Sequence, residues 1–480
     1  MSARCVMVLG TTSGAGKSWL ATALCRWYAR QGLRVAPFKA QNMSNNARVV
    51  AGGEIGSAQY FQALAARAEP DVRMNPLLLK PERDTHSQVV LLGRVDEALS
   101  RQGWRGRSAS VWPRVRAAFD ELRAAHDVVV LEGAGSPAEI NLKDADIVNM
   151  RTALHAQARC LLVTDIDHGG AFADLYGTWA LLPPDERVLL RGFVLNKFRG
   201  DASLLAPGPQ QLQELTGVPT VAVLPMWWDH GLPEEDGWYA RSAVPAVVPG
   251  AEVTVAIVAY PRISNLDEFQ PLAEVPGVQL RWVRSPRELE GADWVVLPGS
   301  KHTSGDLAWL RAQGLDAAIA AHAARGGRVL GLCGGLQMLG EALVDPHGID
   351  GNAPGLGLLP LVTAFAPDKT VQRTGAAFGQ VRGAWAALSG LAVQGYEIHH
   401  GQTAPHPAMP APHPVLPGGL GWQNTEGNVL GVYLHGLFED ERVLRALFGM
   451  APPSLDRVFD GLADFIDAHF APGVLAGLIA

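Results

Sequence analysis

A glycine-rich loop near the start of the chain constrains the fold more than any other feature. The apolar run Cys5–Leu9 leads into Gly10–Ser18, which reads GTTSGAGKS, and a helical pattern follows over 19–30. In such a loop the backbone N–H groups face phosphates at a helix N-terminus, the lysine neutralises their charge and the serine hydroxyl can bind Mg²⁺. Gly10 lies one residue earlier than in the strict motif and Thr11 stands in its place; we include Thr11 among the nucleotide-binding residues. The loop predicts a nucleotide-binding domain, and a ligand-free strand-to-helix turn is the alternative.

Two series of apolar runs alternate with helical or loop stretches, which is typical of βαβ units around mostly parallel sheets. The runs are continuous rather than alternating, as expected when helices cover both faces of a sheet. Between the series, residues 232–250 are rich in Pro, Gly and acidic residues and predict a linker. The first series is Cys5–Leu9, Leu33–Phe38, Val128–Leu131, Cys160–Thr164, Gly192–Leu195 and Val221–Leu224, and the second is Val253–Val258, Val278–Val283, Trp294–Leu297, Val329–Leu332 and Val429–Leu434.

These patterns predict an α/β protein with two main domains, over residues 1–231 and 251–445. Residues 446–480 form a separate C-terminal tail in this interpretation, with an amphipathic acidic helix over Leu455–Phe470 that we expect to dock on protein rather than on lipid. Ala404–Gly419, rich in Pro and His, is predicted to be an irregular surface loop.

Charge and composition exclude several classes of function. The 480 residues include 40 Lys and Arg and 47 Asp and Glu, a net charge of −7, with no basic block that could follow a phosphate backbone or an anionic membrane. The four cysteines form no C-x-x-C pair, and no targeting segment or spanning apolar run is visible. We therefore expect a cytoplasmic protein with neither nucleic acid nor a membrane as partner; its oligomeric state stays open.

Two polar residues end buried strands of the first series, where ligands bind in open parallel sheets. Glu132 follows Val128–Leu131 and is a candidate Mg²⁺ ligand together with Ser18. Asn196 ends the run Gly192–Leu195, and its amide can both donate to and accept from a base edge. The sequence NKFR at 196–199 lacks the Asp of a guanine-reading pattern, which favours adenine; a turn-forming Asn196 is the alternative.

The segment Pro37–Asn46 carries a dense group of amides and one lysine after the second strand. Carboxamide donors and an ammonium group beside a γ-phosphate suit a substrate rich in carboxylates and amides. We expect Lys39, Gln41, Asn42 and Ser44 to bind that substrate, and a polar surface loop is the alternative.

A second chemical motif, GLCGG at 331–335, follows an apolar strand and precedes a helical run. It matches the strand–turn–helix elbow that exposes a nucleophile, and a helix N-terminus favours the thiolate. We predict that Cys333 is a catalytic nucleophile rather than a buried small apolar residue.

Cys333 needs a base, and His435 lies at the end of the strand Val429–Leu434. His399 and His400 are the competing candidates. The loop 297–301 ends another strand, so that backbone N–H groups of Gly299 and Gly334 are candidates for an oxyanion hole. A thiol and a histidine in this setting predict acyl transfer or amide hydrolysis.

The two motifs have a joint explanation. Glutamine hydrolysis in one domain makes ammonia, and ATP in the other activates a carboxylate as an acyl phosphate that ammonia attacks. The sequence thus predicts a glutamine-dependent amide ligase that uses ATP and Mg²⁺.

The same segments closely resemble the cobyric acid synthase family, over the chain to about residue 445. The resemblance rests on Gly10–Ser18, Pro37–Asn46, Glu132–Leu142, Asp165–Asp167, Leu195–Asp201 and Gly331–Gly340. It implies a dethiobiotin-synthetase-like P-loop domain, a class I glutamine amidotransferase domain, and amidation of the b, d, e and g carboxylates of the corrinoid adenosylcobyrinic acid a,c-diamide.

The resemblance also implies roles for single residues. Thr12, Gly14, Gly16, Lys17 and Ser18 would contact the nucleotide phosphates, Cys333 and His435 would be the catalytic pair, and Glu54 would join Glu132 as a metal-site candidate. The wider amidotransferase class has a Glu two residues after this His, whereas here Leu437 stands there and Glu439 lies further on. Another group is therefore expected to orient His435.

Two rival interpretations share part of these motifs. Cobyrinic acid a,c-diamide synthase has both domain types, and the amide cluster Gln41–Asn46 argues against it. A positioning or partitioning ATPase has a similar loop, but it would leave Cys333 without a purpose.

Overall fold

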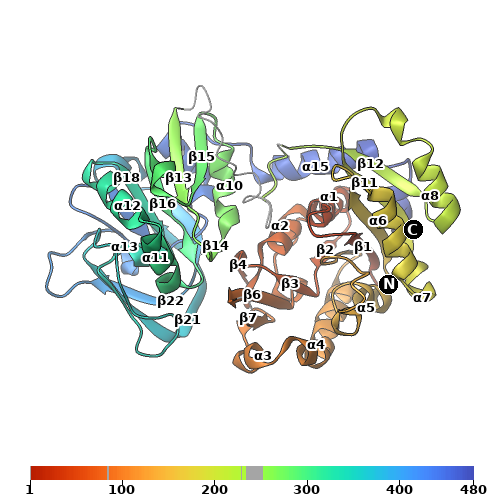
Figure 1. Cartoon of the computed structure of the whole chain (residues 1–480), viewed down its shortest axis with the longest axis horizontal. Helices are drawn as coiled ribbons and strands as arrows, with labels where there is room; N and C mark the ends of the chain where they lie inside the picture. The colour runs from red at the N-terminus through yellow and green to blue at the C-terminus, as the bar shows by residue number, and fades with distance from the viewer. Residues whose placement is uncertain (1, 84–85, 229, 234–251) are drawn as a thin grey trace. The chain divides into compact units, whose positions relative to one another are not determined.

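The first strand series forms a six-stranded parallel sheet in the computed structural model, which describes residues 2–83, 86–228, 230–233 and 252–480. Strand order is β12-β11-β10-β1-β9-β2, so that β1 lies between β9 and β10. Figure 1 labels β1, β2, β11 and β12 of this sheet. The first-series predictions are confirmed to within a few residues at the strand ends. The strands are β1 (Arg4–Gly10), β2 (Val35–Phe38), β9 (Val128–Glu132), β10 (Arg159–Asp165), β11 (Leu190–Phe198) and β12 (Thr220–Pro225).

Helices cover both faces of this sheet, which explains the continuous apolar runs. One face packs against α1 (Lys17–Arg30), α2 (Ser57–Ala65), α15 (Leu455–His469) and α16 (Val474–Gly477). The other packs against α4 (Trp104–Ala125), α5 (Met150–Ala156), α6 (Ala171–Leu181) and α8 (Gly208–Thr216). Two shorter helices are α3 (Glu97–Arg101) and α7 (Pro184–Arg187).

A small sheet of order β3-β6-β7-β8 accompanies the main one, and the sequence patterns did not predict it. Its strands are β3 (Gln41–Met43), β6 (Leu77–Arg83), β7 (His86–Leu91) and β8 (Arg94–Val95); β4 (Ala47–Val50) and β5 (Gly53–Gly56) lie between β3 and β6 in the chain.

The second strand series forms a seven-stranded sheet of order β15-β13-β16-β18-β25-β24-β23, parallel from β15 to β25 and antiparallel beyond. Its predicted strands are confirmed. They are β13 (Val253–Val258), β15 (Val278–Val283), β16 (Trp294–Leu297), β18 (Arg328–Leu332) and β25 (Val429–Val432), extended by β24 (Gly421–Gln423) and β23 (His413–Leu416). The helices are α10 (Gln270–Ala273), α11 (Thr303–Ala312), α12 (Leu315–Ala324), α13 (Gly334–Leu339) and α14 (Glu441–Phe448).

A long antiparallel hairpin in this half was missed by the sequence analysis. It pairs β21 (Leu361–Ala377) with β22 (Ala392–Pro405), and β19 (Ala342–Val344) and β20 (Ala353–Pro354) complete its sheet. Much of β21 is partly or fully exposed, so its sequence shows little apolar periodicity. The irregular loop expected over Ala404–Gly419 is wrong in part, because β22 ends at Pro405 and β23 pairs with β24.

The chain divides into two compact units, and each unit is assembled from segments that are separated in the sequence. Unit 1 comprises Met1–Ser44, Val50–Leu232 and Ser454–Ala480, and unit 2 comprises Asn45–Val49 and Pro233–Pro453. Most of the expected linker 232–250 lies outside the described residues.

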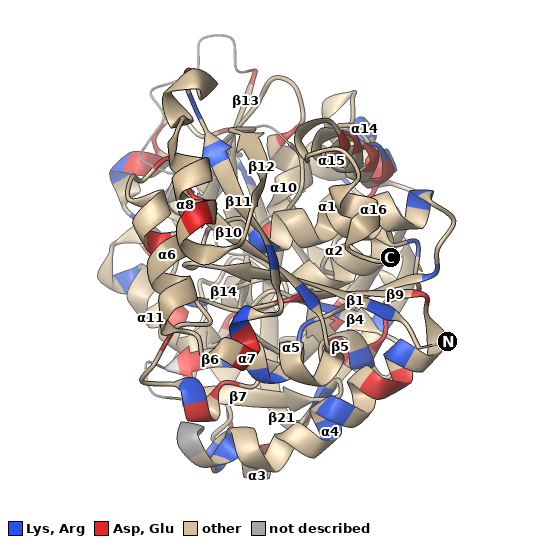
Figure 2. Ribbon diagram, turned by 90° about the vertical axis from the view of Figure 1, so that its right-hand side faces the viewer, with Lys and Arg blue, Asp and Glu red and all other residues tan. Residues whose placement is uncertain are grey.

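The C-terminal helix is a part of unit 1 rather than the separate tail we expected at 446–480. Phe459, Leu462 and Ile466 of α15 are buried in the apolar core that α1 shares. Arg26 of α1 is fully buried and pairs with Asp456 and Asp460, at 2.8 Å each. Figure 2 shows the acidic residues of α15 on the ribbon beside α1. Docking on protein is therefore what the structure shows for this helix.

Among the described residues, no helix is both long and apolar enough to cross a membrane.

Candidate active sites

The glycine-rich loop joins β1 to α1 and brings the predicted phosphate-binding residues together. Gly16 has φ 102°, a left-handed conformation that favours glycine, and a Cβ there would lie 2.1 Å from Nδ2 of Asn196. The loop is also tied down from outside, because the Thr11 hydroxyl donates to that of Thr164 at 3.0 Å. Lys17 Nζ donates to the carbonyl oxygens of Thr12 at 2.8 Å and Gly135 at 3.2 Å. The lysine ammonium thus lies over the loop, where phosphates bind in loops of this kind.

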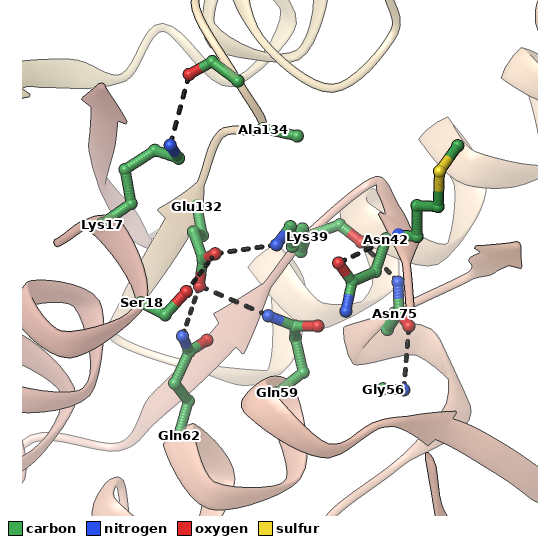
Figure 3. Close-up of polar contacts among 12 residues, drawn as sticks. Lys17, Ser18, Lys39, Asn42, Gly56, Gln59, Gln62, Asn75, Glu132 and Ala134 are labelled. Carbon is green, nitrogen blue, oxygen red and sulfur yellow. Dashed lines mark hydrogen bonds and ion pairs between the residues drawn. The ribbon is translucent and has the colours of Figure 1, made fainter. Parts of the chain in front are cut away.

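Glu132 ends β9 and gathers donors from three other segments (Figure 3). Its Oε1 accepts from Ser18 Oγ and from Lys39 Nζ, both at 2.8 Å. Its Oε2 accepts from Gln62 Nε2 at 2.5 Å and from Gln59 Nε2 at 3.4 Å. Burial alone raises the pKa of Glu132, but Lys39 and the hydrogen bonds from Gln62 and Ser18 outweigh it and lower that pKa. The carboxylate is therefore ionised at neutral pH.

The donor set at Glu132 fits a hard divalent cation that also binds phosphate. Ser18 and Glu132 supply oxygen atoms beside the loop, and Mg²⁺ is commonly held by one or two protein oxygens plus phosphates and water. Within the described part of the chain, no group of three or more His, Cys, Asp or Glu side chains is arranged to hold a metal.

Glu54, the second metal candidate, forms an ion pair with Lys80. Its carboxylate accepts from Lys80 Nζ, and both side chains are buried. A metal-binding role for Glu54 stays a prediction.

Asn196 lies beside the phosphate loop. Its Nδ2 donates to the carbonyl oxygen of Ala15 at 2.9 Å, and the side chain is buried. The next residue, Lys197, donates from Nζ to Gly14 O at 2.9 Å and to Asp165 at 2.8 Å. These contacts give 196–197 a role in fixing the loop; the expected contact with a base stays a prediction.

The predicted substrate residues begin next to Glu132 and continue along β3. Lys39 contacts Glu132 directly, whereas Asn42 and Ser44 are buried further on and Gln41 is half-buried. Ser44 N donates to Leu79 O at 3.0 Å, which ties the end of this segment to β6. The segment is therefore ordered rather than a loose surface loop.

Gln59 and Gln62 are site residues that the sequence analysis missed. Both lie on α2, three residues apart, and therefore on the same helix face. Their side chains are fully buried although glutamine is usually exposed. The available signal was two glutamines at helical spacing within an otherwise apolar helix.

The elbow at Cys333 has the predicted strained geometry. Cys333 follows β18 with φ 50° and ψ −105°, a conformation that is unfavourable for a residue other than glycine. A Cβ on Gly335 would lie 1.9 Å from Leu297 O, so only glycine fits this close approach. Cys333 N donates to Val432 O at 2.8 Å, which holds the elbow beside β25.

His435 faces this elbow from the end of β25. Its backbone pairs with Tyr396 of β22, and the two rings stack with centroids 5.4 Å apart. Burial lowers the pKa of His435, but Glu268 and Cys333 outweigh burial and raise that pKa to about 10. Nε2 of the ring is buried and makes no hydrogen bond to other described residues. The ring is therefore charged at neutral pH and close to the thiol.

Glu268 orients His435, and the sequence analysis did not find it. The His435 Nδ1 donates to Glu268 Oε1 at 3.0 Å, and Gly436 N donates to Glu268 Oε2 at 3.0 Å. Glu268 lies in the short helix η4 (Leu266–Phe269) and is fully buried. A fully buried glutamate is rare unless paired, but nothing in the sequence near His435 indicates which of the chain's glutamates fills this place.

Neither competing histidine is better placed as the base. His399 Nδ1 bonds Gly401 O at 2.8 Å and Nε2 bonds Glu397 Oε2 at 3.1 Å. Both ring nitrogens of His399 are thus engaged by partners other than the thiol. His400 Nδ1 bonds the carbonyl oxygen of Ala366 at 3.1 Å.

The glycines proposed for an oxyanion hole lie beside the catalytic pair. A Cβ on Gly299 would lie 2.7 Å from Cε1 of His435, and one on Gly334 would lie 2.7 Å from the backbone nitrogen of Ser300. The loop that contains Gly299 is held by β17 (Gly299–Ser300), which pairs with β14 (Ile263–Ser264). Both glycines thus lie next to Cys333 or His435, and the oxyanion-binding role of their N–H groups stays a prediction.

The other three cysteines are unsuited to nucleophilic chemistry. Cys5, Cys25 and Cys160 are buried, and burial raises the pKa of each thiol.

Two family models match the chain, one over each half. The model described as "CobQ/CobB/MinD/ParA nucleotide binding domain" matches residues 6–235, and the model described as "CobB/CobQ-like glutamine amidotransferase domain" matches residues 254–443. The chain is thus of the class that joins a P-loop-type nucleotide-binding domain to a glutamine amidotransferase domain, and the predicted fold class is confirmed.

Close relatives extend over the full length. The chain is 76% identical to a cobyric acid synthase of Variovorax paradoxus over 482 residues, 75% identical to one of Polaromonas naphthalenivorans over 488, and 73% identical to one of Polaromonas sp. over 500. The matches cover 100% of this chain and 99 to 100% of each relative. The chain belongs to the cobyric acid synthase family.

Proposed function

We propose that this protein uses ATP and glutamine to amidate the b, d, e and g carboxylates of adenosylcobyrinic acid a,c-diamide, giving adenosylcobyric acid in cobalamin biosynthesis. The observation that carries the proposal is the presence of two sites in one chain of this family. One is the glycine-rich loop, whose Ser18 contacts Glu132, and the other is the group of Cys333, His435 and Glu268. The first suits phosphoryl transfer and the second suits amide hydrolysis, and an amide ligase needs both.

In unit 2 the chemistry follows from the order of the three side chains. The Cys333 thiolate attacks the side-chain amide carbon of glutamine, and the backbone N–H groups near Gly299 and Gly334 stabilise the oxyanion. His435 gives its Nε2 proton to the departing ammonia while Glu268 holds Nδ1. Water then cleaves the thioester, releases glutamate and restores the thiol.

In unit 1 the γ-phosphoryl group of ATP passes to a carboxylate of the corrinoid, and ammonia displaces phosphate from the acyl phosphate. Lys17, whose ammonium group contacts the loop, and Lys39, whose ammonium group contacts Glu132, neutralise the transferring group. Asn196 is assigned to the base, and Gln41, Asn42 and Ser44 to the acceptor. Mg²⁺, held by Ser18 and Glu132, would supply further positive charge to the phosphates.

Counting amides by mass spectrometry tests this function. Adenosylcobyrinic acid a,c-diamide is incubated with the protein, ATP, Mg²⁺ and glutamine, and the expected product has gained an amide at each of the four named carboxylates, only when ATP is present. No change in this substrate, together with amidation of the a and c carboxylates of unamidated cobyrinic acid, would contradict the proposal in favour of a diamide synthase.

A further inference from the structure

A short piece of the N-terminal half of the chain is built into unit 2. Asn45–Val49 belongs to unit 2, although the residues before and after it belong to unit 1. Leu266 N donates to Asn46 Oδ1 at 2.8 Å, and Ala47 N donates to Asn265 Oδ1 at 2.9 Å. These bonds fix the segment to the start of η4, the short helix that carries Glu268.

The segment brings one arginine into a group of acidic side chains. Arg48 is 1% exposed, and its Nη2 lies 2.5 Å from Asp267 Oδ2 and 2.6 Å from Glu439 Oε1. Its Nη1 donates to the hydroxyl of Tyr396, whose ring stacks on that of His435. Arg48 therefore contacts residues that surround the proposed base.

Arg48 supplies one of two cationic groups in an acidic cluster. Arg48 and His435 face three carboxyl groups, of Asp267, Glu268 and Glu439, and the Tyr396 phenol and the Cys333 thiol are further titratable groups there. Burial raises the pKa of Asp267 and of Glu439, and Arg48 is the main opposing influence on each. Removing the guanidinium would leave three acids beside one imidazolium, and like charges in a buried site favour proton uptake.

We propose that Arg48 is a positioning residue of the glutamine-hydrolysing site, which pairs with Asp267 and Glu439 and so keeps Glu268 bonded to His435. The inference rests on the proposed function of unit 2. It assigns a task in amide hydrolysis to a residue that lies two positions beyond the predicted corrinoid-binding segment in the chain. The role goes beyond that of a buried ion pair: by pairing with Asp267 and Glu439, Arg48 leaves Glu268 as the acid that bonds to His435.

The pH dependence of two reactions in the full-length protein tests the proposal. One is glutaminase activity, and the other is the rate at which iodoacetamide alkylates Cys333, which needs no turnover. In Arg48→Met we expect a loss of glutaminase kcat of roughly tenfold or more, equivalent to about one pKa unit of charge stabilisation. The acidic limb of both profiles moves to higher pH, while ammonia-dependent amidation in unit 1 persists.

A charge-restoring pair separates positioning from simple stability. In Arg48→Met/Asp267→Asn one negative charge is removed with the positive one, so the acidic limb should return toward that of the wild type. Arg48→Lys keeps the charge and should keep the wild-type profile with a reduced kcat; it also serves if the methionine variant does not fold. Arg26→Met, which removes a fully buried arginine of unit 1, is the matched control and should leave both profiles unmoved.

Two results would overturn the role of Arg48. One is an unshifted alkylation profile in folded Arg48→Met, and the other is a shifted profile that the Asp267→Asn change does not restore. Absence of glutaminase activity in the wild type would instead contradict the proposed function, and the alkylation profiles would still decide the role of Arg48.

Discussion

Both units place a buried carboxylate at the heart of the candidate site, but they supply its partners differently. Glu132 of unit 1 accepts hydrogen bonds from four side chains, those of Ser18, Lys39, Gln59 and Gln62. Glu268 of unit 2 is fixed by His435 and by a backbone N–H. The first carboxylate is arranged to meet a ligand and the second to hold a base, so the two units should respond differently to the loss of one side chain.

The largest effect is expected from Lys17→Ala. The acyl phosphate cannot form without charge neutralisation at the γ-phosphate, so amidation should be lost with glutamine and with ammonium salts alike. Product is measured by mass spectrometry with each nitrogen source. Retained ammonia-dependent turnover would remove ATP activation from unit 1.

Cys333→Ala should affect one nitrogen source only. Glutamine-dependent amidation should disappear, whereas high ammonium should still support product formation, because only the source of ammonia is lost. Loss of both glutamine-dependent and ammonia-dependent amidation, in a variant whose circular dichroism matches that of the wild type, would contradict the assignment of ammonia release alone to Cys333.

Glu268→Gln should give an intermediate effect in unit 2. The amide can still bond to the ring but cannot stabilise the imidazolium, so glutaminase kcat should fall by roughly 10² to 10⁴-fold, the usual contribution of a general acid or base. Ammonia-dependent amidation is the control. Equal losses with both nitrogen sources would show that Glu268 serves more than His435.

Glu268→Gln should also change how the free energy of unfolding depends on pH. The pKa of His435 is raised from the ordinary value of about 6.5 to about 10, so its pairing stabilises the fold fully below pH 6.5 and loses this effect as pH rises through 10. The difference in unfolding free energy between wild type and Glu268→Gln should therefore shrink between pH 6.5 and 10, as measured by denaturant titration. A difference that does not depend on pH would argue against a charged His435.

Asp456→Asn should have the smallest effect and mark the edge of unit 1. Its carboxylate pairs with Arg26 but is largely exposed, and such pairs contribute up to about 1 kcal/mol. The midpoint of unfolding should fall slightly, with both amidation activities unchanged. A loss of glutaminase activity alone would contradict the placement of α15 in unit 1.

The sequence was most informative where a functional residue directly follows a strand. Glu132, Cys333 and His435 each stand at or just after the end of an apolar run, and parallel strands bring such ends to one edge of a sheet. Residues on helix faces or in short turns gave no comparable signal. Gln62 lies on a helix, and Glu268 meets His435 across more than 150 residues of sequence, so their partners depend on packing that the local pattern does not encode.

Two features of the division into units were missed for a related reason. Composition marked 232–250 as a break, but no compositional change marks Asn45–Val49 as part of unit 2 or Ser454–Ala480 as part of unit 1. Acidic residues on α15 indicated that the helix docks on protein, and only the structure identified Arg26 as the partner.

The return of α15 to α1 has a consequence for synthesis on the ribosome. Domains generally fold as their segments emerge, N-terminal first. Here unit 1 is completed by Ser454–Ala480, which are made after Pro233–Pro453 of unit 2, and Arg26 meets its acidic partners only then. The nucleotide-binding unit therefore finishes folding after the amidotransferase unit has been synthesised. A chain that terminates before Ser454 lacks a segment of its nucleotide-binding unit even though the rest of that unit has been made.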